Sequence, residues 1–174
     1  MNNDNFVGNT KSATDILGNV WNYDCMGCAI NRGDLIPPGG IIYEGKYVIL
    51  TADTEVPIPG FLIINIKRHV NSFSELEKEE RIEVVNLLTH AEKAIKKLGI
   101  GKYVFVIQEE TSSHLHIWIF PYSDEMEKKY GKESSHLREI MKEYVKNSND
   151  EIVKKVLDVV EKVKEYFNKH DINQ

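Results

Sequence analysis

The segment from His114 to Trp118 alternates side chains that can do chemistry with apolar ones. Because successive side chains of a β-strand point to opposite faces, His114, His116 and Trp118 would share one face of a sheet. Leu115 and Ile117 would share the other face and pack in the core. A neutral imidazole, whose unperturbed pKa is about 6.5, can act near neutral pH as a nucleophile or as a metal ligand. The segment therefore predicts a strand that presents two imidazoles and an indole to a ligand.

Three hydroxyl side chains stand immediately before this strand, at Thr111, Ser112 and Ser113. Side-chain O–H groups and the N–H groups of a tight turn are suited to holding phosphate oxygens. A serine-rich turn between two strands also forms without any ligand. We expect phosphate contacts here, with a purely structural turn as the alternative.

Cys25 and Cys28 are the two cysteines of the sequence. In a reducing compartment such a pair is more plausibly a metal half-site or a redox pair than a structural disulfide. Two ligands do not complete a tetrahedral site, so a metal would require histidines from elsewhere. The redox interpretation is disfavoured because no obvious strand precedes the pair and no clear helix follows it. Reduced, buried thiols are the remaining alternative.

An acidic residue, Asp53, follows one of the apolar segments. A carboxylate is a double acceptor and suits the two neighbouring hydroxyls of a ribose. It would equally suit a turn ahead of Pro57. On the residues alone, both interpretations remain open.

Hydrophobic periodicity and turn residues predict the elements that position these side chains. Capping-box spacing at Ser74–Glu77 opens a helix whose apolar residues recur every three or four positions until Gly99. Together with the strands, this helix predicts an α+β domain, in which an antiparallel five-stranded sheet packs one face on the helix and leaves the other to a ligand. A short helix is also expected at Ser12–Trp21. The five strands are expected at residues 41–44, 47–50, 61–66, 103–108 and 114–120.

The chain has 174 residues, of which 41% are hydrophobic, and this size fits one domain with a core of its own. We expect residues 1–121 to form that domain, with residues 1–11 disordered. Charged helix formers then dominate, which predicts a C-terminal helical extension over residues 122–174, packed on the same domain and divided at Asn147–Asp150. Three histidines in helical stretches receive no role: His90, His136 and His170.

The formal net charge is −5, from 27 acidic and 22 basic side chains, and the lysines are dispersed. This balance argues against a general binder of nucleic acid polymers, which needs a concentrated basic surface. No apolar run approaches the roughly 20 residues that span a bilayer, and the polar N-terminal residues contain no apolar signal segment. We expect a cytoplasmic protein that acts on a small molecule and has no membrane partner.

Taken together, these residues resemble the histidine triad superfamily, whose defining strand reads His-φ-His-φ-His-φ-φ, with φ an apolar residue. His114 and His116 match the first two histidines, and Trp118 stands where the third would be. Pro121 follows at the distance at which a proline often follows that position in the family. The similarity covers about Cys25 to Pro121 and includes Tyr43-Glu44, Asp53, Pro59-Gly60-Phe61, Leu62–Ile66 and Lys67-Arg68-His69-Val70.

The resemblance implies a nucleotide-binding hydrolase or nucleotidyltransferase, including a phosphorylase. In the family the second histidine is the nucleophile, so His116 would attack the α-phosphate of a nucleoside phosphate ester or anhydride, such as a dinucleoside polyphosphate, and form a nucleotidyl-histidine. Asp53 would bind the ribose, the Thr111–Ser113 loop would hold phosphate, and Met26 and Ile30 would line the base pocket. Family members are commonly homodimers, which implies the same here.

Zinc-containing branches of the superfamily add a histidine after the third strand and use the first histidine of the triad strand. His69 and His114 occupy those two positions. With Cys25 and Cys28 they would form a Cys2His2 set, which is closed and suits structural zinc rather than a catalytic water.

Trp118 departs from the family pattern. It is placed in the nucleotide-binding site by the resemblance, yet an indole donates one hydrogen bond and cannot carry a proton between groups. Some transferases and phosphorylases of similar pattern have glutamine there, so chemistry through His116 remains the first hypothesis. The alternative is a non-catalytic nucleotide-binding or regulatory module with a structural zinc. A third, a redox protein, would depend on the two cysteines instead.

Overall fold

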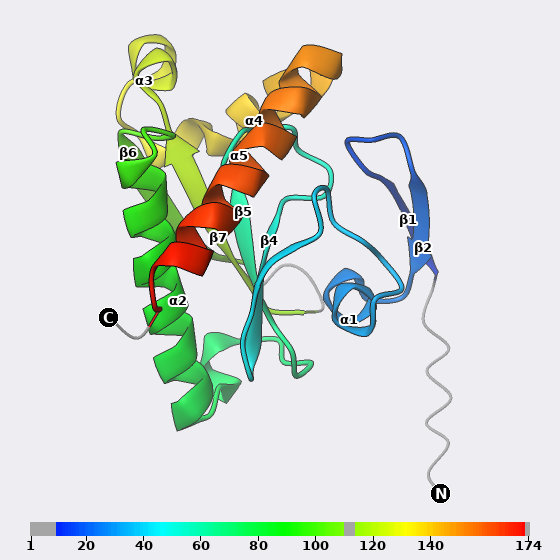
Figure 1. Ribbon diagram of the computed structural model, residues 1–174. Helices are drawn as coiled ribbons and strands as arrows, with labels where there is room; N and C mark the ends of the chain where they lie inside the picture. The colour runs from blue at the N-terminus through cyan, green and yellow to red at the C-terminus, as the bar shows by residue number, and fades with distance from the viewer. Residues whose placement is uncertain (1–9, 110–113, 173–174) are drawn as a thin grey trace, which may run out of the picture.

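The computed structural model describes residues 10–109 and 114–172, and its centre is a five-stranded antiparallel sheet (Figure 1). The strand order is β3-β4-β5-β7-β6, so neighbours in the sequence are mostly neighbours in the sheet. The predicted α+β class and the antiparallel five-stranded sheet are confirmed. The strands are β3 (Ile41–Glu44), β4 (Val48–Ala52), β5 (Leu62–Ile66), β6 (Tyr103–Glu109) and β7 (His116–Tyr122).

One face of the sheet packs on the long helix α2 (Lys78–Lys97). Leu115, Ile117 and Ile119 belong to the buried cluster that α2 shares with the sheet, as strand alternation predicts. The start of the helix differs from the prediction. Its capping box is formed by Glu77 and Glu80, and the residues around Ser74 form a separate 3-10 turn, Phe73–Glu75. The Ser72 side chain therefore caps that turn, and no serine caps the helix.

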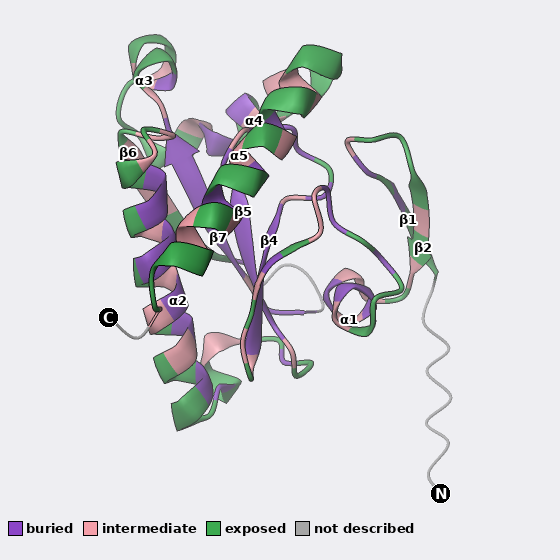
Figure 2. Ribbon diagram, viewed as in Figure 1, coloured by how far each residue is buried: buried purple, intermediate pink, exposed green. Residues whose placement is uncertain are grey.

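The opposite face of the sheet, predicted to be available for a ligand, is covered in part. Helices α3 (Asp124–Tyr130) and α4 (Leu137–Lys146) cover one end of it. The central strands β5 and β7 are buried along most of their length (Figure 2). Only the other end of this face remains for a ligand. The apolar cluster under the two helices includes Phe61, Trp118, Phe120, Tyr122, Met126, Leu137 and Ile140.

The last helix, α5 (Asp150–Lys169), lies on the α2 side of the sheet, beside β3 (Figure 1). Val160 and Val163 are almost completely buried there, in the same cluster as the residues of α2. The helical segment after Pro121 thus contributes to both faces of the sheet. The predicted division holds, because α4 ends at Lys146 and α5 begins at Asp150, with the Asn149 side chain as its cap. The short helix α3 and a 3-10 turn, Ser134–His136, were not predicted.

The helix predicted at Ser12–Trp21 is wrong, because a β-hairpin stands there. Its strands are β1 (Lys11–Thr14) and β2 (Val20–Tyr23). The turn is built around Asp15, whose Oδ1 accepts the backbone N–H groups two and four residues on, both at 2.9 Å. Gly18 completes it with a φ of +85°, which residues with a side chain rarely adopt. Lys11, in the stretch predicted to be disordered, therefore belongs to a strand, and residues 1–9 of that stretch lie outside the described residues.

In the part of the chain that the structure describes, every helix is too short or too polar to cross a bilayer.

Candidate functional site

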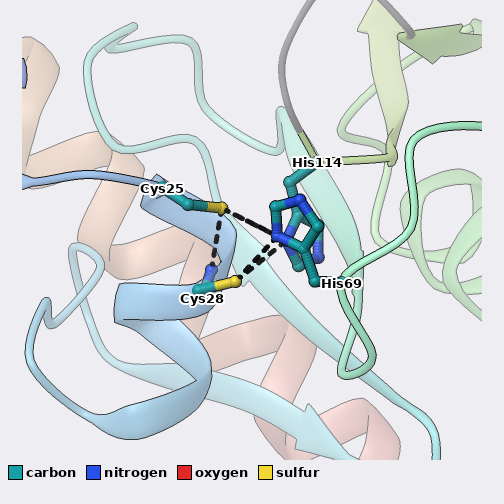
Figure 3. A group of neighbouring side chains, drawn as sticks. All are labelled: Cys25, Cys28, His69 and His114. Carbon is teal, nitrogen blue, oxygen red and sulfur yellow. Dashed lines mark hydrogen bonds between the residues drawn. The ribbon is translucent and has the colours of Figure 1, made fainter. Parts of the chain in front are cut away.

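Four side chains meet at one end of the sheet, Cys25, Cys28, His69 and His114 (Figure 3). Cys25 caps helix α1 (Met26–Arg32), His69 follows β5, and His114 precedes β7. The Cys28 Sγ lies 3.0 Å from Nδ1 of His69 and 3.5 Å from Nδ1 of His114. The Cys25 Sγ lies 3.6 and 3.3 Å from the same two nitrogens. All four ligand atoms are within 4.8 Å of one another, as the corners of a small metal site must be.

The tautomer of His114 suits metal binding. Its Nε2 lies 2.7 Å from the carbonyl oxygen of Ile66, and a carbonyl only accepts, so Nε2 carries the proton. In the neutral ring Nδ1 then has the lone pair, and Nδ1 is the atom that faces the two sulfurs. A hydrogen bond from the second ring nitrogen to a backbone carbonyl is the usual way in which a ligating histidine is oriented.

Gly27 allows helix α1 to approach this ring closely. A Cβ at this position would stand 2.7 Å from Cγ of His114, too close for two carbon atoms. The small residue inside the Cys25-x-x-Cys28 segment is therefore required by the packing of the two cysteines against His114.

The four donors form a Cys2His2 set whose number and chemistry fit a structural zinc ion, as the resemblance implies. Although burial raises it, the neighbouring His114 side chain and the backbone N–H of Cys28 lower the pKa of the Cys25 thiol to about 6. A thiolate is the form that zinc binds. The site ties α1 to two separate loops of the sheet, so the metal would fix the start of β7.

The surroundings of Cys25 and Cys28 differ from the prediction that no obvious strand precedes them and no clear helix follows them. Strand β2 ends just before Cys25 and helix α1 begins just after it, although neither was predicted. The case for a metal depends instead on the two imidazoles that face the sulfurs.

Beside the zinc site lies a cavity of about 300 Å³, bounded by α1, the open end of the sheet and the β1–β2 hairpin. His116, the first residue of β7, lies in its wall. Its Nδ1 is 3.1 Å from the carbonyl oxygen of His114, so Nδ1 carries the proton and Nε2 has the lone pair of the neutral ring. Burial lowers the pKa of His116, against the opposing effects of that hydrogen bond and of the Glu109 charge. The ring can therefore offer a nucleophilic nitrogen.

Asp53 also lines the cavity and serves as a turn residue at the same time. Its Oδ1 accepts the backbone N–H groups of Glu55 and Val56, at 2.9 and 2.8 Å. Its Oδ2 makes no hydrogen bond to any of the described residues, which leaves it for a ligand in the cavity. Burial raises the pKa of this carboxyl group to about 6, against the two N–H groups, which lower it. The two interpretations of Asp53 are thus compatible.

The remaining predicted nucleotide-binding residues fall in different places. Met26 and Ile30, on one side of α1, both line the cavity. Trp118 lines it too, but only 7% of its surface is exposed, and its ring packs edge-on against Phe61 with the centroids 5.6 Å apart. The Thr111–Ser113 loop lies outside the described residues.

Several residues of the cavity wall were not predicted. Asn65 is a buried polar residue of β5 and stands opposite His116 in the β5–β7 ladder. A lone amide in the apolar strand Leu62–Ile66 was the signal that could have indicated it. Three others have no local signal, because the hairpin and α4 bring them in from distant parts of the chain. These three are Lys11, Tyr23 and Met141.

No protein-family model matches the sequence, and no curated protein matches it. Solved structures do match. A Hit-like protein from Bartonella henselae, described as involved in cell-cycle regulation, is 19% identical, with a TM-score of 0.57 over 79% of this chain and 92% of that one. A Zn-bound histidine triad family protein from Mycobacterium smegmatis is 15% identical, with a TM-score of 0.55 over 81% and 96%. A HIT family protein from Bacillus subtilis is 18% identical, with a TM-score of 0.55 over 76% and 96%.

At these identities the likeness shows the fold. The chain has the fold of the histidine triad proteins, as its resemblance to that superfamily predicts. The Cys2His2 cluster, together with a zinc-bound structure of the same fold, supports structural zinc.

Proposed function

We propose that this protein binds a nucleotide in the cavity beside the zinc site and transfers its nucleotidyl group through His116, as a hydrolase or a nucleotidyltransferase. The observation that carries the proposal is the placement of His116 and Asp53 in the wall of one cavity. His116 offers an imidazole with its proton held on Nδ1, and Asp53 offers a carboxylate oxygen, Oδ2, without a protein partner among the described residues.

The reaction needs two displacements at phosphorus. In the first, the lone pair of His116 Nε2 forms a P–N bond while the P–O bond to the leaving phosphate or alcohol breaks, and solvent protonates the leaving oxygen as its basicity requires. In the second, water or inorganic phosphate forms a new P–O bond, loses a proton to solvent, and releases the imidazole. The hydrogen bond from Nδ1 to the carbonyl of His114 holds the ring in the correct tautomer throughout.

The nucleotide would lie across the cavity, with its ribose hydroxyls on Asp53 and its base against Met26 and Ile30. A carboxylate can accept from both hydroxyls of a ribose. The Thr111–Ser113 loop, just before β7 in the sequence, is proposed to hold the phosphates. Zinc has no open position in a Cys2His2 set, so its part is to hold the start of β7 in place.

Incubation with diadenosine tetraphosphate, with and without inorganic phosphate, tests the proposal. AMP formed in water indicates a hydrolase, and ADP formed only with phosphate indicates a phosphorylase. His116→Ala should abolish turnover and the nucleotidyl adduct seen by mass spectrometry. His136→Ala, on a surface turn, is the matched control and should retain both. Undiminished turnover in His116→Ala would exclude the mechanism.

A second candidate is a non-catalytic nucleotide-binding module. The packing of Trp118 against Phe61 favours it, because an almost buried indole cannot exchange a proton with a leaving group. This module would bind mononucleotides saturably, with neither product nor adduct.

The remaining features of the function are proposals of the same kind. We propose that residues 1–121 and 122–174 form one domain, that the protein works in the cytoplasm, and that it is a homodimer. Size-exclusion chromatography with light scattering tests the dimer, and cell fractionation tests the location.

A further inference from the structure

The cavity is poor in positive charge for a site that would hold phosphate. Asp53 and Glu55 line it with two carboxyl groups, and Lys11 is its only lysine or arginine among the described residues. Lys11 belongs to the β1–β2 hairpin rather than to the sheet that carries His116. Phosphoryl transfer normally requires cations or N–H donors around the oxygens of the phosphoryl group. Trp118 offers only one indole N–H and no charge.

A cation stands directly over Trp118. Arg138, in the first turn of α4, places its guanidinium carbon 5.2 Å from the centre of the indole ring. Helix α4 packs on the same face of the sheet that carries His116 and Trp118, and Met141, one turn further along, lines the cavity. Arg138 is not itself among the residues that line the cavity, but it contacts Trp118 and lies one turn from Met141, both of which do.

A buried carboxylate anchors this guanidinium. Arg138 Nη2 donates to Oε2 of Glu109 at 2.9 Å. Glu109 pairs with His116 across the β6–β7 ladder, and directly opposed residues of an antiparallel pair point to the same face with their Cβ atoms about 5 Å apart. The cation is thus held by the residue that is next to the nucleophile on the neighbouring strand.

The exposure of the two partners is unequal. The Glu109 side chain is 8% exposed and that of Arg138 is 66% exposed. A guanidinium has five N–H donors, and Glu109 is the only hydrogen-bond partner of Arg138 among the described residues. The rest of its fork is accessible to an anion from solvent, and a planar fork of this kind suits two oxygens of one phosphate.

We propose that Arg138 binds a phosphate group of the nucleotide beside His116, and so supplies from α4 the positive charge that Trp118 does not provide at the third triad position. The inference rests on the proposed nucleotide site. It makes Arg138 a substrate-binding residue that neither the sequence pattern nor the fold assigns.

Binding of AMP and of adenosine, measured by titration calorimetry, separates a phosphate contact from a structural one. The zinc-loaded wild type should prefer AMP to adenosine. Arg138→Ala should weaken AMP binding about tenfold, the effect of one charge-assisted contact, while adenosine binding changes less than twofold. Arg138→Lys should retain part of the preference, because it keeps the charge and loses the fork.

Lys129→Ala is the matched control. Like Arg138→Ala, it removes an exposed cation that pairs with a carboxylate, here Glu143 of α4. Lys129 itself belongs to α3 and is not the cation that lies over Trp118. It should leave the affinities for AMP and adenosine unchanged. Equal loss of both affinities in Arg138→Ala, or no loss of either, would overturn the inference and leave Arg138 as a structural partner of Glu109.

These measurements need no turnover, so the two proposals can fail separately. If the wild type makes no product, and Arg138→Ala lacks the preference for AMP that the wild type has, the phosphate contact is supported and the reaction is not. If the wild type turns over through His116, and Arg138→Ala still prefers AMP to adenosine as strongly as the wild type does, the reaction is supported and the contact is refuted.

Discussion

Asp53→Asn should make the protein more stable and a poorer nucleotide binder. Burial raises the pKa of the Asp53 carboxyl group from 3.8 to about 6, which means that the folded protein disfavours its charge. Each pKa unit corresponds to about 1.4 kcal/mol, so the ionised group lowers the free energy of unfolding by up to about 3 kcal/mol. Asparagine keeps an Oδ1 for the N–H groups of Glu55 and Val56 and carries no charge.

The sign of the effect fixes its pH dependence. Between pH 3.8 and 6 the folded protein holds a proton that the unfolded chain has released, so the stability of the wild type falls as the pH rises through this window. Below it, Asp53 is protonated in both states and costs nothing. The advantage of Asp53→Asn should therefore be absent near pH 3.5, grow through pH 5 and be complete above pH 6.

Urea unfolding at pH 3.5, 5 and 7.5, followed by tryptophan fluorescence, measures the difference between the two proteins. Zinc release at low pH affects both equally and cancels in this difference. Asp34→Asn is the control, because that exposed carboxylate pairs only with Arg32 among its described neighbours, and its exchange should change stability little at any pH. The same Asp53→Asn protein should bind AMP about tenfold more weakly, since the proposed charged acceptor for the ribose is lost. A variant less stable than the wild type at pH 7.5, or a pH-independent difference, would refute the reasoning.

Two further substitutions test the zinc site and the domain organisation. Gly27→Ala should lower the zinc content measured by atomic absorption, although alanine favours the helix by about 1 kcal/mol, because its Cβ would displace the His114 ring. Its melting temperature should approach that of wild type treated with a chelator, and full zinc occupancy would contradict the geometry. Val163→Ala, a truncation in the buried face of α5, should cost about 2 kcal/mol within a single unfolding transition. A separate transition for α5 would instead disprove a single domain.

Local patterns predicted the parts of the fold that strand alternation or helical periodicity determines by itself. The alternation around His116 placed Leu115 and Ile117 in the core correctly. The resemblance identified the four zinc ligands, which the structure brings together. The N-terminal hairpin was not predicted from the sequence, because a polar residue such as Asp15 can begin a helix as readily as it can build a turn. What decides is a contact with Trp21, whose indole N–H donates to Asp15 at 2.8 Å.

The contribution of α4 could not be predicted for a different reason. Periodicity shows that a helix has an apolar face but does not show which surface that face will cover. The pair of Arg138 and Glu109 joins residues that are 29 positions apart, and neither belongs to a recognisable motif. Such pairs follow from tertiary packing alone.

His114 belongs to two sites through two different groups. Its ring nitrogen faces the sulfurs, while its backbone carbonyl oxygen accepts the hydrogen bond from Nδ1 of His116 that fixes the tautomer of that ring. Replacing the His114 ring removes a metal ligand and should also loosen the peptide that orients His116, the proposed nucleophile, so the resulting phenotype mixes two causes. Cys28→Ser removes a thiolate ligand and leaves His114 itself unchanged. Comparing the two variants would show how much of the activity depends on the metal and how much on one carbonyl oxygen.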